Sequence, residues 1–178
     1  MINHPKGGGL LALMLLHDSR REARVVDGEL VPLAEQDRSR HDRIKVEAGR
    51  AALERALALR PAPGPYVLHA AIASLQADEQ VDWDQVALLY ARLERLTGSP
   101  VVALNRAVAV AEAGAPDRAL ELVDPLELGD YRYLHSTRAE LLRRLGRPQE
   151  AREAFQDALR LAATDPERRF LARRLAGL

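Results

Sequence analysis

The sequence contains no cysteine, so disulfide bonds, cysteine-ligated zinc sites and thiol catalysis are excluded. Aromatic residues make up only 4% of its 178 residues, which disfavours β-sheets, whereas abundant alanine and leucine favour helices. The 26 basic and 26 acidic residues cancel, so the chain lacks the basic excess of a nucleic-acid-binding protein. Its apolar run Leu10–Leu16 is too short to cross a membrane. We therefore expect a helical, cytoplasmic protein with neither a membrane nor a nucleic acid as a direct partner.

The N-terminal residues differ in pattern from the rest of the chain. Residues 1–9 show no periodicity and no secretory signal, and are expected to be a flexible leader. Leu10–Leu16 begins the first helix. Because this segment is apolar nearly all round, it should be buried on several sides.

A change of pattern comes after the first helix. Asp27-Gly28 lies between two short β-favouring runs, which predicts a small β-hairpin near residues 25–33. Asp37 or Ser39 should cap the next helix, which must end before Pro61 because proline breaks the helical hydrogen-bond ladder.

The rest of the chain is predicted to form helices joined by short turns. The expected helices are near 65–77, 83–97, 100–113, 116–128, 130–145, 148–162 and 166–176. Two of the hairpins repeat. Five pairs of identical residues are each separated by 32 positions: Arg106/Arg138, Ala107/Ala139, Gly114/Gly146, Pro116/Pro148 and Ala119/Ala151. The alanines would let paired helices approach closely, while each glycine would end one helix and each proline begin the next.

The second copy resembles the tetratricopeptide repeat family. It has that family's spacing in Gly146, Ala151, Phe155 and Ala158, whereas the first copy is degenerate. A third, more divergent unit is expected over Tyr66–Leu93. The last helix should be a cap that begins at Thr164 or Asp165. Its apolar residues Phe170, Leu171 and Leu175 should face inward, and its arginines 168, 169, 173 and 174 outward.

These patterns predict an all-α fold. It is a tetratricopeptide-like helical-hairpin superhelix with the small β-hairpin near residues 25–33. Residues 10–63 would form N-terminal helices and the hairpin, packed on the repeats. Residues 64–178 would hold about three units and the capping helix.

No pattern of catalytic residues stands out. The histidines form no metal-binding pair, no serine lies in a nucleophile-elbow motif, and the glycines at 7–9 lack the rest of a phosphate-binding loop. We expect neither an enzyme nor a metal or cofactor site.

Charge is unevenly distributed along the chain. Residues 64–129 carry 4 basic and 10 acidic residues, whereas 1–63 carry 11 and 9, and 130–178 carry 11 and 7. Arginines 20, 21, 24, 38, 40 and 43 bracket the predicted hairpin. They could form a docking patch for an acidic partner or a nucleic-acid backbone. The favoured interpretation is pairing with acidic residues between them, which include Asp18, Asp37 and Asp42.

A partner-binding groove is expected on the first helices of the repeats. Its candidate residues are Tyr66, His69, Asn105, Arg106, His135 and Arg138. Arg106 and Arg138 are equivalent in the two copies, which suggests a ligand-binding rung or a repeated structural pair. A small-molecule sensor would be favoured only if His69, Arg106, His135 and Arg138 converge on a closed pocket.

Longer strings show a more specific resemblance. They are Leu10–Arg21, Gln36–Arg40, Gly64–Tyr66 with Ala70–Ala73, and Ser99–Ala109. These strings are similar to the C-terminal extension of one group of bacterial extracytoplasmic-function RNA polymerase sigma factors. That resemblance covers residues 10–178, and it implies a tetratricopeptide-like extension without the promoter-reading regions. His41 departs from it, because an aromatic residue is expected there.

The resemblance implies a regulatory protein-interaction module that modulates transcription initiation. Its partners would be the sigma-factor core regions in cis, RNA polymerase or a regulatory protein. The junction with the core would involve His17, Asp18, Arg20, Arg21, Asp37 and Arg38. The alternative is a generic tetratricopeptide peptide-binding scaffold.

Overall fold

The computed structural model describes residues 5–59 and 62–178. Its elements group into two compact units. Unit 1 comprises residues up to Asp27 together with Val31–Thr97, and unit 2 comprises Gly28–Leu30 together with Gly98–Leu178. The division falls after Thr97, whereas the sequence suggested a boundary at 63/64, because the helices that follow residue 63 pack with the N-terminal helices.

The elements of unit 1 are α1 (Pro5–Asp18), α2 (Arg21–Arg24), β1 (Val25–Val26), η1 (Leu33–Glu35), η2 (Arg38–Arg40), α3 (Arg43–Ala58), α4 (Pro65–Leu75) and α5 (Trp83–Thr97). Those of unit 2 are β2 (Glu29–Leu30), α6 (Pro100–Glu112), α7 (Pro116–Val123), α8 (Arg132–Arg144), α9 (Pro148–Arg160) and α10 (Asp165–Ala176). None of the helices within the described ranges is both long and apolar enough to cross a lipid bilayer.

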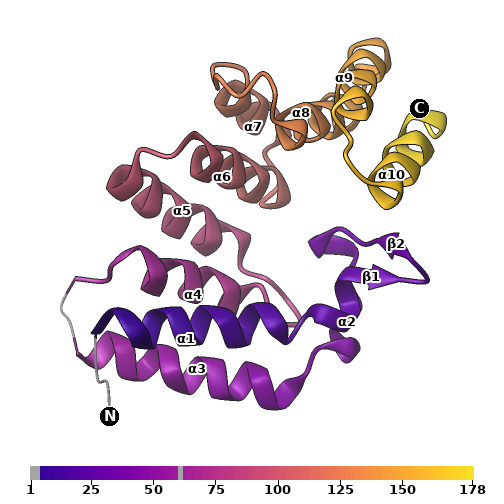
Figure 1. The fold of residues 1–178 in the computed structure, drawn as a ribbon. Coiled ribbons are helices and arrows are strands. Elements are labelled where there is room, and N and C mark those ends of the chain that lie inside the picture. The colour runs from indigo at the N-terminus through magenta and orange to yellow at the C-terminus, as the bar shows by residue number, and fades with distance from the viewer. Residues whose placement is uncertain (1–4, 60–61) are drawn as a thin grey trace. The chain divides into compact units, whose positions relative to one another are not determined.

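The core of unit 1 lies where α1, α3 and α4 pack side by side (Figure 1). Its buried residues include Ala12, Leu16, Leu53 and Ala70. The approach of α1 to α3 depends on Gly49, because a Cβ there would lie 2.7 Å from Leu16 Cγ. A glycine therefore sets the spacing between two helices at this crossing.

One expectation for the N-terminal segment is wrong. Helix α1 already begins at Pro5, so residues 5–9 are not an unstructured leader; residues 1–4 lie outside the described chain. Gly9 is buried, and a Cβ there would lie 2.8 Å from Val67 on α4. The helix is buried where it packs against both α3 and α4, while Leu11 is 50% and Met14 61% exposed. Only the face toward α3 and α4 is covered.

The β-hairpin forms where it was predicted. Strands β1 and β2 pair, and Asp27 and Gly28 between them have φ angles of 51° and 76°. Two consecutive positive φ angles are the signature of the tight turn that Asp-Gly favours.

The capping prediction for the helix after the hairpin is wrong. Asp37 caps the short helix η2, where its carboxylate accepts from the Ser39 N–H at 2.9 Å. Asp42 caps α3 instead by accepting from the Lys45 N–H. Asp37 and Asp42 occur in similar sequence contexts, so the sequence pattern alone does not show which of the two caps the long helix.

Unit 2 contains the two repeat copies, which end their first helices in the same way. The Ala115 N–H donates to the Val110 carbonyl after α6, and the Arg147 N–H donates to the Leu142 carbonyl after α8. Gly114 and Gly146 adopt the positive φ angles that these turns require, 99° and 69°. Pro116 and Pro148 then begin α7 and α9, as predicted.

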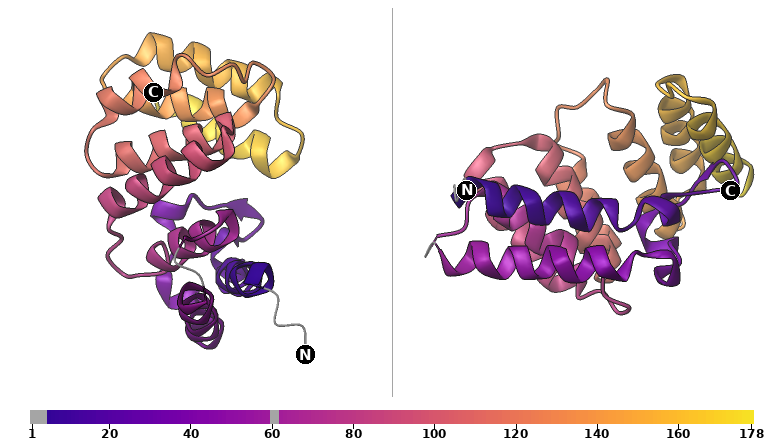
Figure 2. Two further views of the ribbon diagram at one scale, coloured as in Figure 1. Left: turned by 90° about the vertical axis from the view of Figure 1, so that its left-hand side faces the viewer. Right: turned by 60° about the horizontal axis from the view of Figure 1, so that its bottom comes forward.

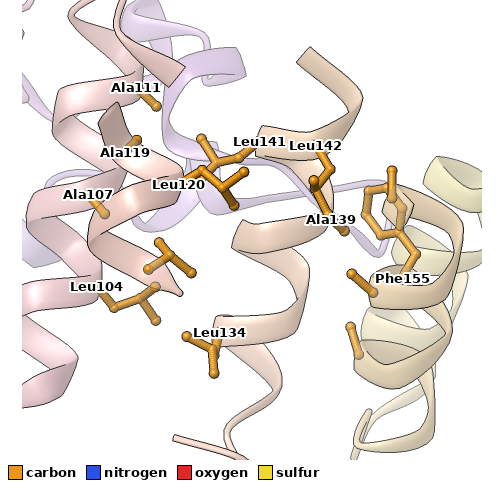
Figure 3. Packing of buried hydrophobic residues seen from close by; sticks show 14 of the residues in the cluster. Leu104, Ala107, Ala111, Ala119, Leu120, Leu134, Ala139, Leu141, Leu142 and Phe155 are labelled. Carbon is orange, nitrogen blue, oxygen red and sulfur yellow. The ribbon is translucent and has the colours of Figure 1, made fainter. Parts of the chain in front are cut away.

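The core of unit 2 combines alanines with leucines and Phe155 between paired helices (Figure 3). Ala107, Ala119, Ala139 and Ala151 are fully buried, which agrees with the predicted close approach of the helices. Phe155 fills the core in the second copy, where the first copy has Val123.

Helix α10 closes unit 2 against α9 (Figure 2). Thr164 and Glu167 form a reciprocal capping box at its start, and Leu171 is fully buried. Its arginines do not all point freely into solvent: Arg169 and Arg173 both bind the Glu29 carboxylate, at 2.8 and 2.6 Å. Residues 28–30 of the hairpin therefore belong to unit 2.

Candidate functional site

The first helices of the two copies, α6 and α8, are held in register by an ion pair. Arg144 Nη2 lies 2.6 Å from Glu112 Oε1, and these two residues occupy equivalent positions because they are 32 apart. Arg144 also lies 3.3 Å from Glu140, one turn earlier on α8. Equivalent positions on α6 and α8 are thus brought side by side. Arg106 on α6 and Arg138 on α8 are also 32 residues apart, so they occupy equivalent positions as well.

Two predicted groove residues on α8 make contacts within unit 2. The distance from His135 Nε2 to the Gly129 carbonyl oxygen is 2.7 Å. Arg138 Nε donates to the Asp124 carboxylate at 3.0 Å. Both partners belong to the segment that joins α7 to α8. Asn105 and Arg106 are half-buried on α6.

The other two predicted groove residues lie in unit 1. Tyr66 is 48% exposed in the first turn of α4. His69 is half-buried one turn later, and burial lowers its pKa. The six residues are therefore divided between α4 in unit 1 and α6 and α8 in unit 2. A single groove that contains all six stays a prediction.

The predicted junction residues of unit 1 fall into two sets. In the first set, contacts are at the surface: Lys45 Nζ lies 2.8 Å from Asp18 and 3.3 Å from Asp42, and Arg21 approaches Asp18 only to 3.9 Å. Lys45, which the sequence did not single out, therefore takes the aspartates that were expected to pair with arginines.

The second set is drawn together around Arg20. Arg38 Nη1 donates to the carbonyls of Leu33 and Gln36, at 2.8 and 2.7 Å, so its guanidinium is held against the backbone. The Ser19 carbonyl accepts from the Asp42 N–H at 2.9 Å, which brings Arg20 beside His41. Arg20 and His41 are only 7% and 6% exposed. We call Arg20, Arg38 and His41 the basic cluster.

The basic cluster shifts the pKa of its own members. Burial, followed by the charge of Arg24, lowers the pKa of Arg20 to about 10, so the guanidinium remains protonated at neutral pH. Burial and then the charges of Arg38 and Arg20 lower the pKa of His41, although Asp37 opposes this shift. The cluster therefore places the buried Arg20 guanidinium and the half-buried Arg38 guanidinium beside an imidazole whose pKa is lowered.

His17 extends this environment to the end of α1. Arg24 Nη2 donates to its ring Nδ1 at 2.9 Å and to its carbonyl at 3.0 Å. Burial, and then the charges of Arg20 and Arg24, lower the pKa of His17 to about 4. The ring acts as a hydrogen-bond acceptor because it is held neutral.

Unit 2 contains a largely buried ion pair that the sequence did not predict. Arg132 Nη2 lies 2.7 Å from Glu167 Oε1, and the side chains are only 10% and 16% exposed. The Arg132 guanidinium also lies 3.9 Å from the centre of the Tyr133 ring. The partners are 35 residues apart and share no sequence motif, so only the fold brings them together.

The part of the chain that the structure describes contains no group of three or more histidine, aspartate or glutamate side chains placed to hold a metal ion.

Two protein-family models match parts of the chain. Residues 132–165, which include α8 and α9, match the tetratricopeptide repeat. Residues 1–57 match a family of unknown function, DUF6596. The chain thus contains a tetratricopeptide repeat and, in its N-terminal third, a DUF6596 region.

Comparison with whole proteins supports the same fold. The chain is similar to the crystal structure of a thermophilic TPR protein from Thermus thermophilus, with a TM-score of 0.50 and 20% identity, over 75% of this chain and 90% of that one. The predicted all-α, tetratricopeptide-like fold is confirmed. The chain is also 44% identical to an uncharacterized protein of Rhizobium meliloti (strain 1021), over 96% of this chain but 42% of the relative. The chain thus spans less than half the length of that relative.

Proposed function

We propose that the chain is a protein-interaction scaffold without catalytic activity, and that its unit 2 binds a protein segment along α6 and α8. The observation that carries this proposal is the repeat register: the Glu112–Arg144 pair places equivalent positions of two successive first helices side by side. Surfaces of this kind present a ladder of side chains at a fixed spacing, which suits an extended peptide.

The chemistry of the surface indicates the kind of partner. Arg106 and Arg138 occupy equivalent positions, and Asn105 and His135 lie next to or one turn from them. Arginine forks and amides form directional hydrogen bonds to carboxylates and backbone carbonyls. Arg138 holds the exposed Asp124 in this structure, and a partner carboxylate would compete for that contact. We therefore favour a peptide with carboxylate groups as the ligand.

Site-specific crosslinking tests the scaffold proposal. A photoreactive benzoyl-phenylalanine in place of Arg106 should give a saturable crosslink to a protein in a lysate of the source organism. Arg152, exposed on α9 away from the first helices, provides the matched control position. Arg138→Ala should weaken the crosslink at position 106. Equal crosslinking from positions 106 and 152, or no saturable product, would contradict the proposal.

A more specific version is that this scaffold is the regulatory extension of a bacterial sigma factor. Supporting it are the strings Leu10–Arg21, Gln36–Arg40 and Ser99–Ala109, which are similar to such extensions. The R. meliloti relative extends well beyond the part aligned with this chain, which leaves room for further regions. In this proposal the scaffold docks to the sigma core, RNA polymerase or a regulatory protein, and so modulates initiation.

The full-length R. meliloti relative allows a direct test. It should bind core RNA polymerase and direct initiation in a reconstituted transcription assay, and deletion of its segment aligned with this chain should change the amount of transcript. A pull-down between the deleted segment and the remainder then asks whether the docking occurs in cis. A relative that does not bind core polymerase would overturn the sigma-factor proposal and leave the scaffold proposal standing.

A further inference from the structure

Arg20 is a buried cation with unused hydrogen-bond donors. It follows α1 at the start of α2 and is 7% exposed. Its Nε and Nη1 atoms are buried, and neither has a hydrogen-bond partner among the described residues. Folded proteins nearly always satisfy buried polar groups, and a buried charge in particular is paired.

The neighbours of Arg20 also have buried polar atoms without hydrogen-bond partners among the described residues. Both ring nitrogens of His41 and the Nε of Arg38 are buried and have no partner within residues 5–59 and 62–178. The backbone hydrogen bond from Asp42 to Ser19 fixes residue 41 beside residue 20. The basic cluster therefore concentrates several unused polar atoms from η2, from the residue that follows it and from the residue that precedes α2.

Three aspartates near the cluster in sequence are engaged elsewhere. Asp18 and Asp42 bind Lys45, and the Asp37 carboxylate accepts from the Ser39 backbone. In the described part of unit 1, the charged or ionisable side chains that act on Arg20 are Arg24, Arg38 and Tyr90, and none of these is a carboxylate. Within the described part of unit 1, Asp37 acts on His41, but no carboxylate acts on the Arg20 guanidinium.

We propose that the basic cluster is a binding site for one acidic side chain of a partner protein, whose carboxylate pairs with the Arg20 guanidinium. Arginine presents a planar fork that matches the two oxygens of a carboxylate, and Arg38 and His41 add donors beside it. The small exposed area of Arg20 favours a group carried on a slender side chain over a hydrated free anion. This site lies wholly in unit 1, so it stands even if the proposed surface on α6 and α8 binds nothing.

The test uses the full chain with isotopically labelled arginine and a blocked glutamate, N-acetylglutamate methylamide, as the probe. The Nε–Hε resonance of Arg20, assigned with an Arg20→Lys variant, should shift saturably. The melting temperature should rise above that in sodium chloride of equal ionic strength. Blocked glutamine, which has nearly the same shape and no charge, should do neither. Inorganic phosphate is titrated in parallel and should bind more weakly than blocked glutamate.

Two arginine variants locate the effect. Arg20→Met should weaken binding roughly tenfold, because it removes a charge-assisted hydrogen-bond pair. Arg21→Met is the matched control, since the adjacent Arg21 side chain is 78% exposed, and it should bind like the parent. If Arg20→Met does not fold, the shift of the Arg20 Nε–Hε resonance in the parent protein still shows whether blocked glutamate binds at this site. No shift, an equal shift with blocked glutamine, or tighter binding of phosphate would each overturn the proposal.

Discussion

Two largely buried arginines, one in each unit, have opposite surroundings. Arg132 in unit 2 lies 2.7 Å from the Glu167 carboxylate, and that carboxylate also accepts from the backbone of Ala163 and Thr164. Arg20 in unit 1 has Nε and Nη1 buried without a described partner. The first arginine is part of a closed network, whereas the second is part of a site that lacks its anion.

This difference separates a structural charge from a functional one. Burial would raise the pKa of Glu167, but hydrogen bonds from the Thr164 and Ala163 backbone and the charge of Arg132 outweigh it and lower the pKa. In the basic cluster, burial and like charges act in the same direction and lower the pKa of Arg20. A fold retains such a cluster at a cost in stability, so a gain elsewhere, such as binding, is expected.

The largest effect is expected when the closed network in unit 2 is opened. Glu167→Ala leaves Arg132 buried without its partner and removes half of the capping box of α10. We expect the free energy of unfolding to fall by about 3 kcal/mol. Urea denaturation followed by circular dichroism measures this change.

Asp165→Ala is the control for that variant. Asp165 also pairs with an arginine of α10, Arg168, but the side chains are 77% and 49% exposed. Its replacement should leave the urea midpoint close to that of the parent. Equal losses in the two variants would show that burial of the Arg132–Glu167 pair contributes nothing.

The two units also differ in how they bring helices together. Unit 2 repeats alanines, and unit 1 uses Gly49, where a Cβ would lie 2.7 Å from Leu16 Cγ. Glycine-to-alanine changes inside helices normally stabilise. At Gly49 the overlap of the added Cβ with Leu16 should make the change destabilising instead, and should lower the free energy of unfolding by about 2 kcal/mol.

Gly7 is the matched position for this test, because it lies in α1 and a Cβ added there would have no atom within 4 Å. Gly7→Ala should raise the free energy of unfolding by about 0.5 kcal/mol. Thermal denaturation of both variants gives the comparison. A Gly49→Ala protein as stable as Gly7→Ala would mean that α1 and α3 separate readily.

The regular unit was the more predictable one. Gly114 and Gly146, followed by Pro116 and Pro148, determine backbone conformation locally, so helix ends in unit 2 could be located from sequence. Asp27-Gly28 fixed the hairpin for the same reason, since its turn is a property of two residues.

The candidate sites depend on contacts that are not local. Arg132 and Glu167 are 35 residues apart, and no periodicity links them. Arg20 stands among charged residues, a context typical of a solvent-exposed surface, and its burial becomes visible only when residues 41 and 42 fold against residue 19. Pairing of Asp18 and Asp42 with Lys45 likewise depended on α3 lying beside α1.

The pH dependence of unit 1 should reveal its lowered histidine pKa values. The pKa of His17 in the folded protein is about 4, below its ordinary value of 6.5. As the pH falls, the unfolded chain therefore binds the proton first. The stabilisation of the folded state by neutral His17 is therefore complete above pH 6.5 and is lost as the pH falls toward 4. Because His17 is partly exposed, we expect a loss of only about 1 kcal/mol.

His41 and His69 have pKa values shifted in the same direction, so they add to this loss. Denaturant titrations across this pH range should show a smaller loss in His17→Gln than in the parent. An unchanged pH dependence in that variant would assign the effect to the other two histidines.

The smallest effect on stability is expected at Arg20 itself. Arg20→Met keeps most of the buried volume of the side chain and removes a charge that has no described carboxylate partner. The free energy of unfolding should therefore stay the same or rise by up to about 1 kcal/mol. Arg132→Met, a substitution of the same chemistry in unit 2, should lower it, because Glu167 is left without its arginine. Chemical denaturation of both variants measures the contrast directly. Similar losses at the two positions would mean that Arg20 stabilises unit 1 through its stem and neighbours, and would remove the distinction between a closed network and an unfilled site.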